Sequence, residues 1–165
     1  MSGNLKTTLK AWPVITAMTI GLCYLTQAVA GWLGIELPDQ ENLELVKRYM
    51  GWNATFILLC AQVLVIMPAV EEFVFRWLLF MLPARVAAKR AFPMADAAAV
   101  ASSALFSAAH YIVQPFPDAA FLALFLFGLA QCWLYRKTER IWCPMLNHFL
   151  FNLTNLVLLA VLPQQ

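Results

Sequence analysis

The chain has 165 residues, of which 62% are hydrophobic and only 12% are charged, and it carries a formal net charge of +2. Its mean hydropathy is +0.72. A water-soluble domain of this length could not hide so much apolar surface in one core, so the composition excludes a soluble protein and predicts a membrane protein. The small net charge gives no reason to expect a nucleic-acid partner, and the lipid bilayer is the expected environment.

Five stretches without Asp, Glu, Lys or Arg follow one another along the chain. They are residues 11–35, 49–70, 97–117, 119–135 and 141–165. Most reach the roughly 20 residues that a membrane-spanning helix needs. We therefore expect an all-α integral membrane protein, a compact bundle of about five transmembrane helices. It should form a single membrane domain over residues 1–165, with a leader span at 11–35 and a helical core at 50–160.

The first apolar stretch has features of a secretion signal, because Lys6 and Lys10 precede it and residues 28–30 read Ala-Val-Ala, like a cleavage site. The apolar run nevertheless continues past this site to Ile35. We therefore expect a retained helix.

Basic residues fall in alternate connections between the expected spans, which predicts the orientation of the chain. They are Lys6, Lys10, Arg85, Lys89, Arg90, Arg136, Lys137 and Arg140, and the exceptions to the pattern are Lys47 and Arg48 near the second span. Lys and Arg in short loops tend to stay on the cytoplasmic side. The pattern predicts a multi-pass protein of the plasma (inner) membrane, with a cytoplasmic N-terminus and the C-terminus on the opposite face.

The second helix carries the most unusual sequence. A straight helix from Met50 to Leu82 would be roughly 50 Å long, which exceeds one span. We expect Pro68 to kink and divide it, Pro83 to end it, and the RVAAKR stretch at 85–90 to form a loop. A kink beside the acidic pair at 71–72 would leave room for water or substrate.

The remaining helices are placed by their prolines. The third is expected from Met94 to Ile112, closed by Pro115 and Pro117, the fourth from Asp118 to Tyr135, and the fifth from a start near Pro144. The four cysteines, Cys23, Cys60, Cys132 and Cys143, show no CxxC spacing and are expected to be buried free thiols.

The stretch AVEEFVFRWLLF places Glu71, Glu72 and Arg76 inside an apolar helix. A charged side chain near the bilayer centre costs on the order of 3 kcal/mol, so these three need a reason. Glu72 and Arg76 are four residues apart on one helical face and can form an ion pair, which could be purely structural. Glu71 points about 100° away from that face and has no cation at this spacing. It is left either protonated or facing a polar cavity, and both conditions suit a proton-transfer group.

Two further pairs with four-residue spacing lie on other helices. FSAAH places Phe106 and His110 on one face, and HFLFN does the same for His148 and Asn152. Taken singly, His110 could be a core imidazole bonded to a backbone carbonyl, Phe106 could serve packing, and the last pair could bridge helices. As a set, these groups with the acidic motif form one convergent site in a helical bundle.

The three motifs, in this order and approximate spacing, resemble the CPBP family of CAAX proteases and bacteriocin-processing enzymes. EEFVFR is similar to its EExxxR, FSAAH to its FxxxH and HFLFN to its HxxxN, and the resemblance covers about residues 60–155. It implies an intramembrane glutamic endopeptidase whose catalytic core lies at 50–160 and whose substrate is a protein or peptide with a membrane-associated segment. The short chain favours a transmembrane tail or peptide over a prenylated protein as substrate.

The resemblance also implies the role of each residue. Glu71 is the general base that activates water, and His110 helps to position and polarise that water. Glu72 and Arg76 hold the acidic helix and tune Glu71. His148 and Asn152 donate hydrogen bonds to the oxyanion of the tetrahedral intermediate. This mechanism needs no covalent nucleophile and no cofactor.

Three other functions remain open from the residues. A zinc protease could use His110, His148 and Glu71 as ligands, although no HExxH motif occurs. A non-enzymatic immunity or scaffold protein could use the same polar groups only to hold its bundle together. A transporter with an acidic relay is less favoured, because the chain shows no internal repeat.

Overall fold

The computed structural model describes residues 2–38, 46–51, 53–89, 95–112 and 118–161, and within these ranges the chain is helical and contains no β-strand. The helices are α1 (Ser2–Trp32), α3 (Ala54–Ala61), α4 (Met67–Glu71), α5 (Leu82–Lys89), α6 (Ala95–Ala109), α7 (Phe121–Thr138) and α8 (Trp142–Val161). Two π-helical segments, Gln62–Ile66 and Glu72–Met81, and a 3₁₀ turn at His110–Ile112 complete the described elements. The predicted all-α class is confirmed.

Within the part of the chain that the structure describes, three helical stretches are long and apolar enough to cross a membrane, namely Gly3–Trp32, Ala54–Val86 and Trp142–Val161. The expected count of about five spans is therefore not confirmed. α6 has 15 residues and would extend only about 22 Å, which is less than the hydrocarbon thickness of a typical bilayer. α7 has 18 residues, but its last turn carries Arg136 and Lys137.

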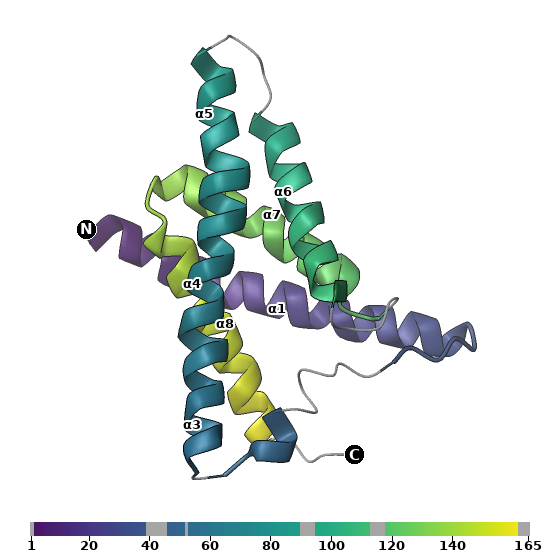
Figure 1. Cartoon of the computed structure of the whole chain (residues 1–165). Coiled ribbons are helices and arrows are strands. Elements are labelled where there is room, and N and C mark those ends of the chain that lie inside the picture. The colour runs from purple at the N-terminus through teal and green to yellow at the C-terminus, as the bar shows by residue number, and fades with distance from the viewer. Residues whose placement is uncertain (1, 39–45, 52, 90–94, 113–117, 162–165) are drawn as a thin grey trace.

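The segment that holds the acidic motif forms one helical run from Ala54 to Lys89 (Figure 1). Asn53 caps its start, because its side chain accepts a hydrogen bond from the backbone N–H of Phe56 at 2.9 Å. The expectations that Pro68 divides this segment, that Pro83 ends it and that Arg85–Lys89 form a loop are wrong. Membrane helices tolerate proline where local π adjustments satisfy the backbone groups that proline frees.

The predicted disturbance at Pro68 is present as a change of hydrogen-bond pattern. Just before Pro68, the N–H of Met67 bonds to the carbonyl of Gln62, five residues back, instead of four. The chain returns to an α pattern in α4 and changes again after Glu71. The acidic pair therefore lies at a junction between an α-helical and a π-helical segment.

α7 and α8 form the middle of the assembly. α1 packs against both of them, and α7 and α8 in turn contact the long run formed by α3, α4 and α5. α6 packs against α7 and against the π-helical segment Glu72–Met81. In Figure 1, α1 runs across the direction of the long run. This arrangement brings parts of α6, α7 and α8 around the acidic motif.

The core between these helices is aromatic. Phe106, Phe127, Leu134 and Cys143 are almost fully buried in one cluster, which also includes Ala11 and Ile15 of α1. α6 and α7 approach closely where Gly128 faces Ser103: a Cβ added at Gly128 would lie 2.9 Å from the Cβ of Ser103. Small residues allow such contacts between membrane helices.

Several sequence predictions fall at the edges of the described residues. Met94, Pro115 and Pro117, which were expected to bound the third helix, lie outside them, as does Arg90. α7 begins at Phe121 and not at Asp118, and α8 begins at Trp142, with Pro144 in its first turn as predicted. All four cysteines are free thiols, but only Cys132 and Cys143 are buried.

Candidate active site

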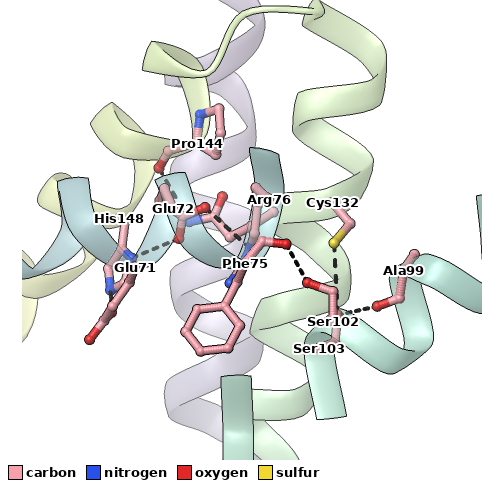
Figure 2. A network of polar contacts seen from close by, with 11 residues as sticks. Glu71, Glu72, Phe75, Arg76, Ala99, Ser102, Ser103, Cys132, Pro144 and His148 are labelled. Atoms are coloured by element: carbon pink, nitrogen blue, oxygen red, sulfur yellow. Dashed lines mark hydrogen bonds and ion pairs between the residues drawn. The ribbon is translucent and has the colours of Figure 1, made fainter. Parts of the chain in front are cut away.

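His148 lies between the two carboxylates of the acidic motif (Figure 2). Its Nδ1 is 2.9 Å from Oε1 of Glu72, and its Nε2 is 3.7 Å from Oε2 of Glu71. The Glu72 side chain is fully buried, whereas the Glu71 side chain is 20% exposed. Glu71 is thus the carboxylate that a substrate or water can reach, and Glu72 is the one that holds the imidazole.

Arg76 neutralises Glu72 inside the protein. The predicted ion pair is present, with Nε of Arg76 3.2 Å from Oε2 of Glu72, and both side chains are completely buried. The guanidinium carbon also lies 4.2 Å from the ring centroid of Phe106, a cation–π contact. No hydrogen bond to Arg76 side-chain nitrogens is found among the described residues. Charge and ring stacking therefore hold this guanidinium.

Phe106 also brings the two histidines to one region of the molecule. Its ring centroid is 4.8 Å from that of His110 and 6.1 Å from that of His148, and both contacts are edge-to-face. In the structure both rings pack on one buried phenyl ring, so Phe106 does more than fill space.

Hydrogen-bond partners fix the tautomers of both rings. Nδ1 of His110 lies 2.9 Å from the backbone carbonyl of Phe106, and Nδ1 of His148 faces the ion-paired carboxylate of Glu72. A carbonyl and a carboxylate accept hydrogen bonds, so each ring donates from Nδ1. Nε2 is then the nitrogen that each ring can offer to another partner. The core role considered for His110 from the sequence is present, and it does not use Nε2.

Asn152 contacts the acidic-motif helix through its amide group. Its Nδ2 donates a hydrogen bond of 2.9 Å to the carbonyl of Val63. Val63 lies in the first π-helical segment, and in an i to i+5 pattern its carbonyl falls opposite Pro68, which has no N–H. Asn152 therefore satisfies a carbonyl that proline leaves without its helical donor. One further amide hydrogen of Asn152 is available for another acceptor.

Two other side chains near the site were missed by the motif analysis. The ring of Phe127 on α7 lies 5.0 Å from that of His148, edge to face. Gln131, one turn further along α7, donates from Nε2 to the carbonyl of Pro144 at 3.4 Å. Pro144 precedes His148 by one helical turn. Phe127 and Gln131 are themselves four residues apart, but their contacts depend on how α7 packs against α8, which the spacing does not show.

The zinc alternative requires three ligands at one point. Across the described ranges, no group of three or more His, Cys, Asp or Glu side chains is placed to hold a metal ion. Glu71 and His148 approach each other, and the Nδ1 atoms of both histidines are engaged with Phe106 and Glu72, which leaves Nε2 of each ring as the atom that could bind another group. Within these residues the arrangement is a close contact of Glu71 with His148, flanked by Glu72 and Arg76.

Comparisons with known proteins agree with the motifs. A search of curated proteins and a search of solved structures each returned no match. A family model described as type II CAAX prenyl endopeptidase Rce1-like matches residues 52–154, which include all three motifs and the helices that carry them. This match covers more than half of the chain and agrees with the resemblance found in the sequence. The chain therefore belongs to the type II CAAX prenyl endopeptidase Rce1-like family, and it is a helical membrane protein of CAAX protease type.

Proposed function

We propose that this protein is an intramembrane endopeptidase that hydrolyses a peptide bond by means of a water molecule activated by Glu71. The observation that carries the proposal is the position of His148 between the exposed edge of Glu71 and the buried Glu72. Peptide hydrolysis requires a base, a held water molecule and hydrogen-bond donors aimed at developing negative charge. The residues around Glu71 can supply each of these.

In the proposed first step, the Glu71 carboxylate takes a proton from water while the water oxygen attacks the scissile carbonyl carbon. The negative charge then lies on the carbonyl oxygen of a tetrahedral intermediate. The proton on Glu71 is next to Nε2 of His148, at a heavy-atom separation of 3.7 Å in the free protein. Distances of this kind shorten in the complex with substrate. Transfer of the proton toward Nε2 turns His148 into a donor on both ring nitrogens.

The second step breaks the C–N bond. His148, held through Nδ1 by Glu72, donates from Nε2 to the oxyanion, and the proton taken from water is finally delivered to the leaving nitrogen. Collapse of the intermediate gives a carboxylic acid and an amine, which become a carboxylate and an ammonium when the acid passes its proton to the amine, so no oxidant, reductant or co-reactant other than water is needed. Arg76 balances the charge of Glu72 throughout, and this prevents an uncompensated buried carboxylate.

His110 and Asn152 have supporting roles in this proposal. Nε2 of His110 is available to accept a hydrogen bond from the attacking water, because Nδ1 donates to the carbonyl of Phe106. One amide hydrogen of Asn152 remains bonded to the carbonyl of Val63, and the second is donated to the oxyanion.

The proposed substrate is a protein or peptide with a membrane-associated segment, for which a transmembrane tail is favoured over a prenylated end. We propose a plasma-membrane location with the N-terminus in the cytoplasm, which the distribution of basic residues along the sequence favours. No cofactor takes part in the proposed reaction.

The experiment that tests the proposal compares protein termini. Purified wild type and Glu71→Ala are incubated with the membrane proteins of the host, and new N- and C-termini are identified by mass spectrometry. We expect termini that form with wild type and are missing with Glu71→Ala. If every terminus forms equally with both proteins, the enzyme assignment fails and the immunity or scaffold function takes its place.

A further inference from the structure

Ser102 is the buried serine that connects α6 to the acidic-motif helix. Its side chain is 1% exposed, and its hydroxyl donates a hydrogen bond to the backbone carbonyl of Phe75 (Figure 2). The two other buried serines of α6 bond elsewhere: Ser103 donates to the carbonyl of Ala99 in its own helix, and Ser107 donates to the carbonyl of Phe121. Of these three similar side chains, Ser102 alone reaches the helix that carries Glu71 and Glu72.

The acceptor of this hydrogen bond lies between the members of the buried ion pair. Phe75 directly precedes Arg76 and belongs to the π-helical segment that begins at Glu72. A π turn contains one more residue between bonded groups than an α turn. The residues that follow it are therefore rotated about the helix axis relative to the residues that precede it. Four-residue spacing leaves Glu72 and Arg76 on one face in either pattern, but the exact angle between them, and the alignment of Arg76 with Phe106 on α6, depend on keeping the π pattern at this point.

π-helical turns are rare, and most are a single turn long. The segment from Glu72 to Met81 has 10 residues, so it needs a source of stability beyond its own backbone bonds. A backbone carbonyl has two lone pairs and can accept a hydroxyl in addition to a helical N–H. The hydroxyl of Ser102 contributes such a second bond inside this segment.

The first π-helical segment is held in the same way from another helix. There the amide of Asn152 on α8 donates to the carbonyl of Val63. The two π-helical segments lie on either side of α4, whose last residue is Glu71. Each of them thus has one carbonyl held by a polar side chain from a neighbouring helix, which makes the contact of Ser102 part of a pattern.

We propose that Ser102 is a positioning residue, whose hydroxyl maintains the π pattern of the acidic-motif helix and so sets the geometry of Glu72 and Arg76. Ser102 acts through the backbone at Phe75 and does not touch substrate. Without the hydroxyl, the segment is free to relax toward an α pattern, and Arg76 then rotates relative to the ring of Phe106 and changes its geometry against Glu72, although both stay on one helical face. The consequence reaches His148, because Glu72 is the group that holds its Nδ1.

The hydrogen bond between His148 and Glu72 can be followed directly by NMR, because the chain contains only two histidines. Protein labelled with ¹⁵N-histidine, in detergent micelles, gives signals from His110 and His148 alone, and a His110→Gln variant identifies them. The variants are Ser102→Ala, Ser102→Thr, which keeps a hydroxyl, and Ser107→Ala. The last is the matched control, since it removes an equally buried hydroxyl from the same helix.

We expect Ser102→Ala to shift the Nδ1 signal of His148 and to leave that of His110 in place. Ser102→Thr should restore the signal of His148, and Ser107→Ala should leave it unchanged. An unchanged signal of His148 in Ser102→Ala, or the same shift in Ser107→Ala, overturns the proposal. This readout needs no substrate and is therefore independent of the proposed function.

Where a cleavage product of the wild type has been identified, kinetics add a second test that rests on the proposed function. We expect the kcat of Ser102→Ala to fall about fivefold with KM nearly unchanged, since one hydrogen bond is worth about 1 kcal/mol. Ser102→Thr should recover most of kcat, and Ser107→Ala should remain close to wild type. An equal loss in both alanine variants would contradict positioning. A shifted His148 signal in a protein that cleaves nothing would contradict the proposed function alone.

Discussion

His148 and Glu72 are 76 positions apart in the chain, and a hydrogen bond of 2.9 Å joins their buried side chains. This bond fixes which nitrogen of the ring is engaged. Because Nδ1 points at Glu72, Nε2 is the atom that faces Glu71. The two adjacent glutamates thus have different surroundings, because Glu72 holds the imidazole inside the protein and Glu71 is partly exposed.

The first prediction separates these two carboxylates. Glu71→Gln should lower kcat at least about 100-fold, because an amide cannot take a proton from water. The substitution keeps the shape of the side chain, so the thermal unfolding midpoint should change little. Cleavage of an identified substrate and unfolding in detergent are measured on the same preparation. Glu36→Gln, at an exposed position, is the control and should retain full activity. Retained cleavage in Glu71→Gln would contradict the role of Glu71 as base.

The second prediction concerns the buried ion pair. Arg76→Leu should reduce the free energy of unfolding by about 3–5 kcal/mol, because it leaves Glu72 charged and without a compensating cation. Combining it with Glu72→Gln should give a protein more stable than Arg76→Leu alone, because the buried charge is then absent. Stability is read from thermal or denaturant unfolding of the four proteins that make up the double-mutant cycle.

The matched control for this cycle is the ion pair of Arg136 with Asp96. Its N–O distance is 2.8 Å, but the side chains are 53% and 88% exposed. Solvent screens such a pair, so its coupling energy should lie below about 1 kcal/mol. Similar coupling in the two cycles would show that burial of Glu72 and Arg76 does not govern their interaction.

Part of this site follows from the sequence. The ion pair of Glu72 with Arg76 was predictable, because four-residue spacing puts two side chains on one face of either helical pattern. The polar motifs also indicated which helices converge. The contact that brings the histidines together was not predictable, since it depends on how α6 and α8 pack around Phe106. Packing of this kind leaves no periodic signal in the sequence.

The helical pattern at the prolines was also beyond the sequence. Proline at 68 and 83 indicated a break, but the chain stays helical because its backbone shifts to a π pattern and Asn152 supplies the donor that Pro68 lacks. That donor lies 89 positions from Val63. Local propensity cannot include a hydrogen bond from so distant a residue, and so it favoured the wrong outcome at these two prolines.

The third prediction tests the metal alternative. Under the proposed mechanism, cleavage should continue after dialysis against a strong chelator, and purified protein should contain far less than one equivalent of zinc. The reason is that the water is activated by a carboxylate, which requires no metal. Elemental analysis and cleavage assays before and after chelation provide the measurement. Stoichiometric zinc, together with loss of activity on chelation and recovery on adding zinc back, would replace the glutamate mechanism with a metal-dependent one.

The fourth prediction concerns the contact between α6 and α7. Gly128→Ala should destabilise the protein by about 1–3 kcal/mol, because the new methyl group would lie 2.9 Å from the Cβ of Ser103 and 3.1 Å from its Cα. Both helices must then separate near Phe127, whose ring packs on His148, so activity should fall together with stability.

Gly21→Ala is the matched control, since nothing lies within 4 Å of its added Cβ, and it should be neutral or slightly stabilising. Ser103→Gly should recover part of the loss in Gly128→Ala by removing the clashing Cβ. If thermal unfolding shows the two alanine variants to be equally stable, the close approach of α6 to α7 at Gly128 does not constrain the bundle.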